Sequence, residues 1–128
     1  MGYKRYRFGL ISILLFSSFY CNAEGISIKN NVHDKVIIFG NDKMMITLDY
    51  NRKCNISDFN VNGQSVISGP AGVFSEIRTS KNKYSTLNLI SVPTIQVREN
   101  IVTVSNIKYG SGEDMIIENW KFLITALT

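Results

Sequence analysis

The sequence predicts an all-β fold, an antiparallel β-sandwich, and three observations lead to this prediction. Short runs rich in β-branched and aromatic residues recur along the chain, and Gly, Pro, Asn and Asp residues separate them. In several runs apolar and polar residues alternate, as in strands with one buried face. No window shows a sustained 3.6-residue apolar period with helix caps. We therefore expect roughly nine strands and no substantial helix, packed as a sandwich.

The first strands are expected at Ile26–Lys29, Val36–Phe39 and Met44–Tyr50, the last of which is rich in β-forming residues. The polar stretch Asn51–Lys53 is expected to turn the chain.

A hairpin is expected at Asn62-Gly63, because both central residues of a type I′ turn need positive φ, which Asn and Gly tolerate. Phe59 and Val61 alternate with polar residues before this turn. The turn places Phe59 opposite Val66 on one face, so the alternation and the turn predict the same register.

Gly69–Gly72 is a second predicted turn, and a strand is expected after it at Val73–Arg78. The polar run Lys81–Lys83 is expected to be exposed. Tyr84–Ser91 is expected to pair as another strand before Pro93, which cannot donate to a ladder.

The best specified hairpin is Thr94–Ser105, with Glu99-Asn100 as its turn. One of its faces is apolar and the other is polar, as in a half-buried antiparallel pair. The predicted cross-strand pairs are Val97 with Val102, Ile95 with Val104, and Gln96 with Thr103.

After this hairpin the apolar phase slips to Ile107 and Tyr109, which predicts a β-bulge near Ser105-Asn106. Gly110–Asp114 is expected to be a loop, and Met115–Leu127 is expected to be the last strand. The apolar side of that strand is predicted to carry Trp120, Phe122 and Ile124.

An apolar last strand that is left as a sheet edge invites aggregation. We therefore expect the sandwich to be incomplete at Thr128 and the natural protein to continue beyond it.

Residues 1–23 have the layout of a secretory signal peptide. A positive segment with Lys4, Arg5 and Arg7 precedes the apolar run Leu10–Phe16. This run is much shorter than the ~20 residues that span a bilayer, so no membrane span is expected. Cys21 and Ala23 supply the small residues for a cut after Ala23, and residues 24–128 are expected to form a single secreted or periplasmic domain. A lipid anchor on Cys21 is the less favoured alternative, because Tyr20 before it is bulky.

The basic character of the chain lies largely in this leader. The whole chain has 14 Lys and Arg and 10 Asp and Glu, a net charge of +4. Without the three basic leader residues, 11 basic and 10 acidic residues remain, a net charge of +1. Nucleic acid is therefore not expected as a partner, because no basic stripe can neutralise phosphates. Cys54 is the only cysteine after the leader, so no disulfide can form within the domain.

Two residues could act as a base or a nucleophile, but His33 is expected to be a solvated loop residue and Cys54 a structural one. His33 is the only histidine and precedes Asp34, but adjacent side chains on a turn rarely adopt the geometry of a base and its orienting carboxylate. Cys54 follows Arg52 and Lys53, which are expected to be solvated, so a half-buried structural thiol is favoured. One His and one Cys far apart do not make a metal site. No catalytic residue, metal ligand or cofactor is assigned.

Carboxylates and aromatic residues are the remaining candidates for a carbohydrate site. Glycoside hydrolysis needs two carboxyl groups at a fixed separation, whereas acids scattered over strands and turns are ordinary surface. Trp120 beside Phe122 fits a core position, and Tyr84 beside the exposed lysines is the better sugar platform. Asn55–Ser57 matches the N-glycosylation sequon. The acids considered are Asp49, Asp58, Glu76, Glu113, Asp114 and Glu118, and the tyrosines are Tyr50, Tyr84 and Tyr109.

Four stretches of strand and turn residues carry a family resemblance: Met45–Tyr50, Asn55–Gln64, Gly69–Val73 and Glu118–Phe122. Together they resemble the start of secreted bacterial glycoside hydrolases in which a β-super-sandwich, similar to galactose mutarotase, precedes an (α/α)6 toroid. The resemblance covers roughly Ile26–Thr125 and implies a super-sandwich fold. It also implies that the catalytic carboxylates lie in the toroid, beyond Thr128, so none is carried over to this chain.

The expected function is that of a non-catalytic N-terminal β-sandwich module of a secreted carbohydrate-active enzyme. Its expected partners are a polysaccharide or oligosaccharide and a C-terminal catalytic domain that is missing from this chain; no ligand-binding residue is assigned. The alternative is a stand-alone secreted or surface β-sandwich that binds a glycan or a protein. A small enzyme that uses His33 is the weakest interpretation.

Overall fold

The computed structural model describes residues 19–20 and 25–126. Most of the predicted leader, including Cys21 and the cut after Ala23, lies outside the described residues, as do residues 127–128. The strands are β1 (Phe19–Tyr20), β2 (Ile26–Asn31), β3 (Val36–Asn41), β4 (Met44–Asp49), β5 (Asn55–Val61), β6 (Gln64–Ser65), β7 (Glu76–Arg78), β8 (Lys83–Ser85), β9 (Thr94–Arg98), β10 (Ile101–Tyr109) and β11 (Ile116–Leu123), with one 3₁₀-helix, η1 (Gly112–Asp114).

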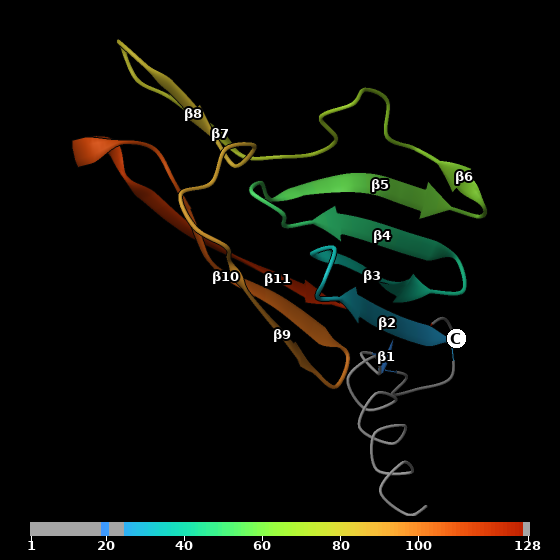
Figure 1. Ribbon diagram of the computed structural model, residues 1–128. Coiled ribbons are helices and arrows are strands. Elements are labelled where there is room, and N and C mark those ends of the chain that lie inside the picture. Colours follow the sequence, from blue (N-terminus) through green and yellow to red (C-terminus); the bar gives the residue numbers. More distant parts are fainter. Residues whose placement is uncertain (1–18, 21–24, 127–128) are drawn as a thin grey trace, which may run out of the picture.

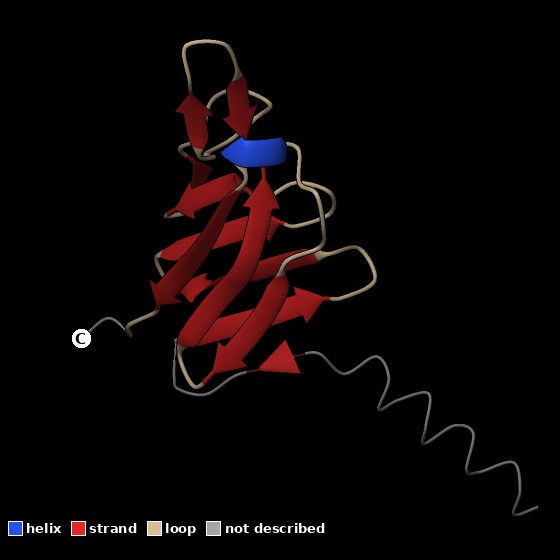
Figure 2. Ribbon diagram, turned by 90° about the vertical axis from the view of Figure 1, so that its left-hand side faces the viewer, coloured by secondary structure: helices blue, strands red, loops and turns tan. Residues whose placement is uncertain are grey.

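The strands form antiparallel sheets, so the predicted all-β fold is confirmed (Figure 1). Strands β1 to β6 form a six-stranded sheet in sequence order, and a three-stranded sheet has the order β11-β10-β9. The three-stranded sheet crosses the larger one as a second layer, which makes the architecture sandwich-like (Figure 2). The hairpin of β7 and β8 projects from one end of the molecule.

The core lies between the two layers. Alternate residues of β2, β3 and β4 point inward and meet alternate residues of β10, as the period of two requires. The rings of Phe39 on β3 and Phe122 on β11 lie 5.0 Å apart at 55°, a favourable tilted aromatic pair. Each fully buried aliphatic side chain contributes about 1.5–3 kcal/mol. The core aliphatic residues with less than 2% exposure are Ile28, Ile37, Leu48, Val102, Val104 and Ile107.

The two hairpins predicted at Asn62-Gly63 and Glu99-Asn100 have the predicted register. Asn62 and Gly63 have φ values of 51° and 82°, as the type I′ turn requires. The amide of Val66 donates to the Phe59 carbonyl over 2.8 Å, which confirms that these two residues lie opposite each other. In the second hairpin the pairs are those predicted: Val97 with Val102, Ile95 with Val104, and Gln96 with Thr103.

The predicted bulge is also confirmed. The register between β10 and β11 shifts between Val104 and Ile107, and Asn106 adopts a φ of 59°. Beyond the bulge, alternate residues of β11 remain on the inner side, with Trp120 and Phe122 half-buried and Ile124 buried after the strand. The predicted apolar side of the last strand is therefore present, although β11 ends at Leu123.

Two predicted strands are much shorter than expected. Val73–Arg78 forms a ladder only at β7, and Val73 makes an isolated bridge with Ile56. Tyr84–Ser91 pairs only at its start, in β8. The chain leaves this ladder because its later amides bond elsewhere: Leu89 donates to the Arg52 carbonyl and Ile90 to the Lys108 carbonyl. The predicted loop Gly110–Asp114 contains η1.

Candidate functional site

Among the described residues, strand β11 pairs only with β10, so it is an edge of the three-stranded sheet. Just after the strand, the amide of Ile124 donates to the Asn100 carbonyl over 2.9 Å. The backbone amide of Ile124, an even-numbered residue, therefore points toward the β9–β10 hairpin. The backbone groups of successive residues alternate in direction along a strand. The amides and carbonyls of Asn119, Lys121 and Leu123 therefore point away from β10, along the open edge.

Two cavities flank this edge. One, of about 340 Å³, lies between the end of β11 and the inner face of β3, β4 and β5, with Phe39, Ile46 and Phe59 among its lining residues. The other, of about 390 Å³, is lined by Ile56, Val73, Phe74, Ser75 and Trp120. Both include Lys121 and Phe122, so they adjoin along the same stretch of β11. We call the two cavities together the edge groove.

The edge groove is lined mainly by apolar side chains, with aromatic rings on both walls. Among the described residues that line it, Lys121 is the one with a charged side chain, and it is exposed. The groove exists because the inner face of the six-stranded sheet continues at β4 and β5 past the last strand of the smaller sheet. Such a surface can bind an apolar or aromatic group but offers no acid or base for proton transfer.

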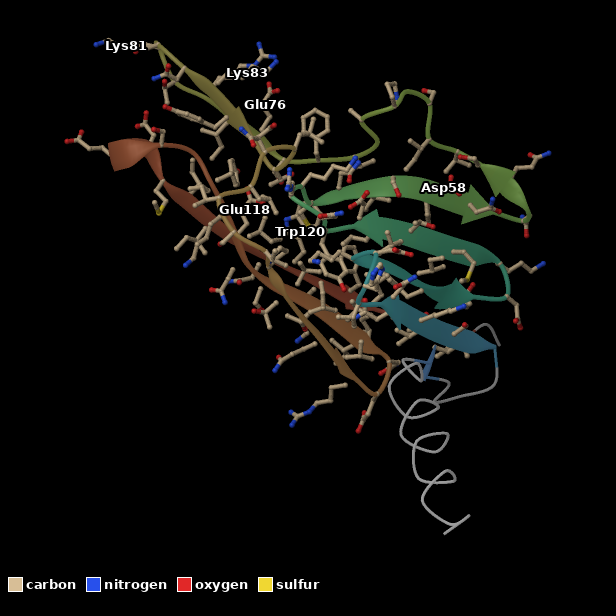
Figure 3. All side chains as sticks on the ribbon, viewed as in Figure 1. Asp58, Glu76, Lys81, Lys83, Glu118 and Trp120 are labelled. Atoms are coloured by element: carbon tan, nitrogen blue, oxygen red, sulfur yellow. The ribbon has the colours of Figure 1, made fainter. Side chains whose placement is uncertain are left out.

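Glu118 lies on β11 next to Trp120, and each of its carboxylate oxygens accepts a hydrogen bond from an aromatic side chain. The Tyr109 hydroxyl donates to its Oε1 over 2.5 Å, and the Trp120 indole donates from Nε1 to its Oε2 over 3.0 Å (Figure 3). Burial by itself would raise the pKa of Glu118, but hydrogen bonds from Tyr109, Trp120 and Ser75 outweigh it and lower the pKa below its usual value. Burial, together with the Glu118 carboxylate, raises the pKa of Tyr109. Glu118 is thus a permanently ionised acceptor near neutral pH.

The other candidate acids lie apart: Glu113 is exposed on η1, and the rest are engaged locally. Glu76 on the projecting hairpin pairs with Arg78 at 2.6 Å and Lys83 at 3.3 Å, while Asp58 lies on the far sheet and accepts from Ser65 (Figure 3). The remaining local contacts are Asp49 with the Asn51 amide and Lys53, and Asp114 with the Tyr84 hydroxyl. These contacts tie the acids to neighbouring residues, and they do not bring two carboxyl groups together.

His33 is solvated as expected, whereas Cys54, which was expected to be half-buried, is fully buried. His33 is 96% exposed, and its Nδ1 lies 3.0 Å from Asp34 Oδ1, which lowers the pKa of Asp34. Cys54 is fully buried, and burial followed by the charges of Glu118 and Asp49 raises the pKa of its thiol to about 12. A thiol with this pKa carries almost no thiolate near neutral pH, so Cys54 is a core residue and not a nucleophile.

The tyrosines and the sequon are also tied into the fold. Tyr84 is half-buried and donates to Asp114 Oδ2 over 3.2 Å, so its ring is not a free platform. Tyr50 is buried and donates to Asn30 Oδ1. Asn55 of the sequon is 1% exposed, and its amide donates to the Ala71 carbonyl, so a glycan on it is incompatible with this fold.

Within residues 25–126 no group of three His, Cys, Asp or Glu side chains is placed to hold a metal ion. Across the same described stretch, no helix is long and apolar enough to cross a membrane.

The sequence predicted Trp120 and Phe122 on the apolar side of the last strand, with Trp120 as a core residue, and it assigned no binding residue on either wall of the edge groove. Phe59 was placed correctly in its hairpin, and Ile46 faces it across the strand pair. What joins these two residues to β11 is the packing of one sheet on the other, which no local pattern encodes. The groove forms where the larger sheet extends past the smaller one, and no local sequence pattern indicates how far one sheet extends past another.

No protein-family model, curated protein or solved structure matches the chain.

Proposed function

We propose that this chain is a non-catalytic β-sandwich module of a secreted carbohydrate-active enzyme, a glycoside hydrolase, and that it supports a catalytic domain outside the chain. The observation that carries the proposal is the apolar edge groove, whose lining includes Phe59, Phe74 and Phe122. An uncovered apolar surface of this kind suits packing against another part of a larger protein. The strand and turn motifs that resemble super-sandwich modules supply the carbohydrate context.

The hydrogen bonds and ion pairs of the acids also favour a non-catalytic role for this chain. Glu118 is held by two donors, and Glu76 is held by two cations. A carboxyl group that protonates a leaving group needs a raised pKa, whereas these two pKa values are lowered.

The test is an assay of glycoside hydrolysis with the purified chain. We expect no release of reducing ends from a panel of soluble plant and bacterial polysaccharides, with circular dichroism showing that the chain is folded. Turnover that disappears in the Glu118→Gln variant would contradict the proposal, because it would make Glu118 a catalytic acid.

The second candidate is a stand-alone secreted or surface sandwich that binds a glycan, and the aromatic lining of the edge groove favours it. Affinity electrophoresis in gels that contain each polysaccharide separates the two candidates. Retardation that is lost in Phe122→Ala and kept in Tyr84→Ala would support glycan binding in the groove. The module proposal predicts that Phe122→Ala leaves the mobility in every gel unchanged, because the groove packs against the catalytic domain.

A further inference from the structure

We propose that the open edge of β11 binds an extended segment of a second polypeptide, which adds to the three-stranded sheet as a fourth strand over the edge groove. This inference goes beyond the proposed function: that proposal packs a further domain of the same protein on the edge groove, whereas this one assigns the groove to a separate polypeptide, and only one of the two can fill it.

The backbone of β11 determines the kind of partner. The outward amides and carbonyls of Asn119, Lys121 and Leu123 alternate along the edge at the repeat of a β-strand. Among the described residues no other strand pairs with this edge. A row of alternating donors and acceptors with this spacing is matched by another extended backbone, which is the basis of recognition by strand addition.

The edge groove determines which side chains that strand carries. A strand beside β11 lies over the inner face of β4 and β5, so every second side chain points into the groove. Those side chains meet Ile46 and Phe59 in one cavity, and Ile56 and Phe74 in the other. The strand therefore has alternating apolar residues on its inner face and polar residues on its outer face.

The charge of Lys121 determines the residue at one polar position of the added strand. Lys121 lines both cavities and a third depression on the outer face of the sheet, which also includes Gln96 and Thr103. No ion pair joins Lys121 to another residue in the part of the chain that the structure describes. A carboxylate on the outer face of the added strand, opposite Lys121, complements this charge.

A second copy of the chain fits this edge less well. If β11 paired with the β11 of another copy, the projecting β4 and β5 of each copy would compete for the same space beneath the joined edges. A single extended segment fills the groove without bringing a second large sheet with it.

The test is a titration of the ¹⁵N-labelled full chain with a capped synthetic peptide of the length of β11. The peptide alternates valine with polar residues, and one of the polar residues is glutamate. Its matched controls are two peptides of the same sequence that carry N-methyl groups on alternate amides, one set for each edge of the strand. We expect saturable shifts of β11 and β5 amides, with binding abolished by one methylation set and kept with the other.

Two variants at one position separate backbone pairing from charge. In Lys121→Pro the outward amide is lost while the bonds to β10 stay, and edge strands tolerate proline. We expect binding to fall by about tenfold or more, since the bonds at that point of the ladder are lost. In Lys121→Thr the amide is kept and the charge is lost, so binding should fall only about two- to threefold.

The proposal is overturned if the peptide causes no shift up to its solubility limit or if it binds at the β9 edge. It is also overturned if both N-methylated peptides bind as well as the parent. Shifts of β11 amides that depend on protein concentration without peptide would assign the edge to a second copy and would refute a foreign strand. The peptide comparison decides the question even if Lys121→Pro does not fold.

Discussion

Glu118 offers the sharpest test of how the interior is organised. Its carboxylate accepts hydrogen bonds from Tyr109, which is fully buried, and from the indole of Trp120. Because the fold lowers the pKa of Glu118, the ionised form stabilises the folded chain. Replacement of this residue should therefore reduce stability by an amount that depends on pH.

The magnitude follows from the two hydrogen bonds. A hydrogen bond to a charged group contributes about 1.5–3 kcal/mol, and one between neutral groups contributes about 0.5–1.5 kcal/mol. In Glu118→Gln the amide oxygen can still accept from Trp120, and its NH₂ group can donate to the Tyr109 oxygen. We expect this variant to lose about 2–3 kcal/mol, because each of the two bonds loses about 1–1.5 kcal/mol. Glu118→Leu leaves the hydroxyl and the indole unpaired and should lose about 3–5 kcal/mol.

The assay is urea denaturation followed by tryptophan fluorescence across a range of pH. A group whose folded pKa is lowered contributes stability above its unfolded pKa, about 4.3 for Glu, and loses it as pH falls through the folded pKa. The deficit of Glu118→Gln should therefore be full at neutral pH and should shrink below about pH 4. Glu113→Gln, on exposed η1, is the matched control and should change stability by less than about 0.5 kcal/mol.

A Glu118→Gln deficit that stays constant from neutral to strongly acidic pH would refute this reasoning, as would a variant that is more stable than the parent chain.

Three further outcomes are expected. Cys54, with its buried thiol, should react with a thiol reagent at mildly alkaline pH only after denaturant is added, and rapid labelling of the native chain would contradict its burial. Gly40→Ala should cost about 3 kcal/mol or more in urea denaturation, because a Cβ there would lie 1.9 Å from the Met44 carbonyl oxygen. Gly63→Ala meets no atom within 4 Å and should cost only about 1 kcal/mol through its positive φ, so equal losses would argue against the steric explanation. Mass spectrometry of the secreted chain should find Glu24 at the N-terminus, and retention of residues 1–23 would contradict the predicted leader.

The sequence predicted the hairpins at Asn62-Gly63 and Glu99-Asn100 down to their registers, because two local constraints agree there. The turn residues at Asn62-Gly63 set the closing pair, and the alternation around Val97 and Val102 places the same residues inward. The bulge before Ile107 could also be predicted, since an extra residue in a strand shifts the apolar phase.

The segments between the two sheets could not be predicted in the same way. Tyr84–Ser91 has the composition of a strand, but the Leu89 amide bonds to the Arg52 carbonyl, a partner 37 residues earlier in the chain. Such non-local bonds leave no local pattern. The same holds for the edge groove. The sequence predicts an apolar side on the last strand, but the position of this strand beside Phe59 depends on how the two sheets pack on each other.

The central claim, that the sandwich is open along β11, is tested most directly by amide hydrogen exchange of the isolated chain, read residue by residue by NMR. The amides of Trp120 and Phe122 point toward β10, so we expect them to be protected. The amides of Asn119, Lys121 and Leu123 point to the open edge, so we expect them to exchange rapidly. This alternation along one strand is the result that an open edge predicts. Uniform protection from Asn119 to Leu123 would show that the edge is already paired and would contradict the account.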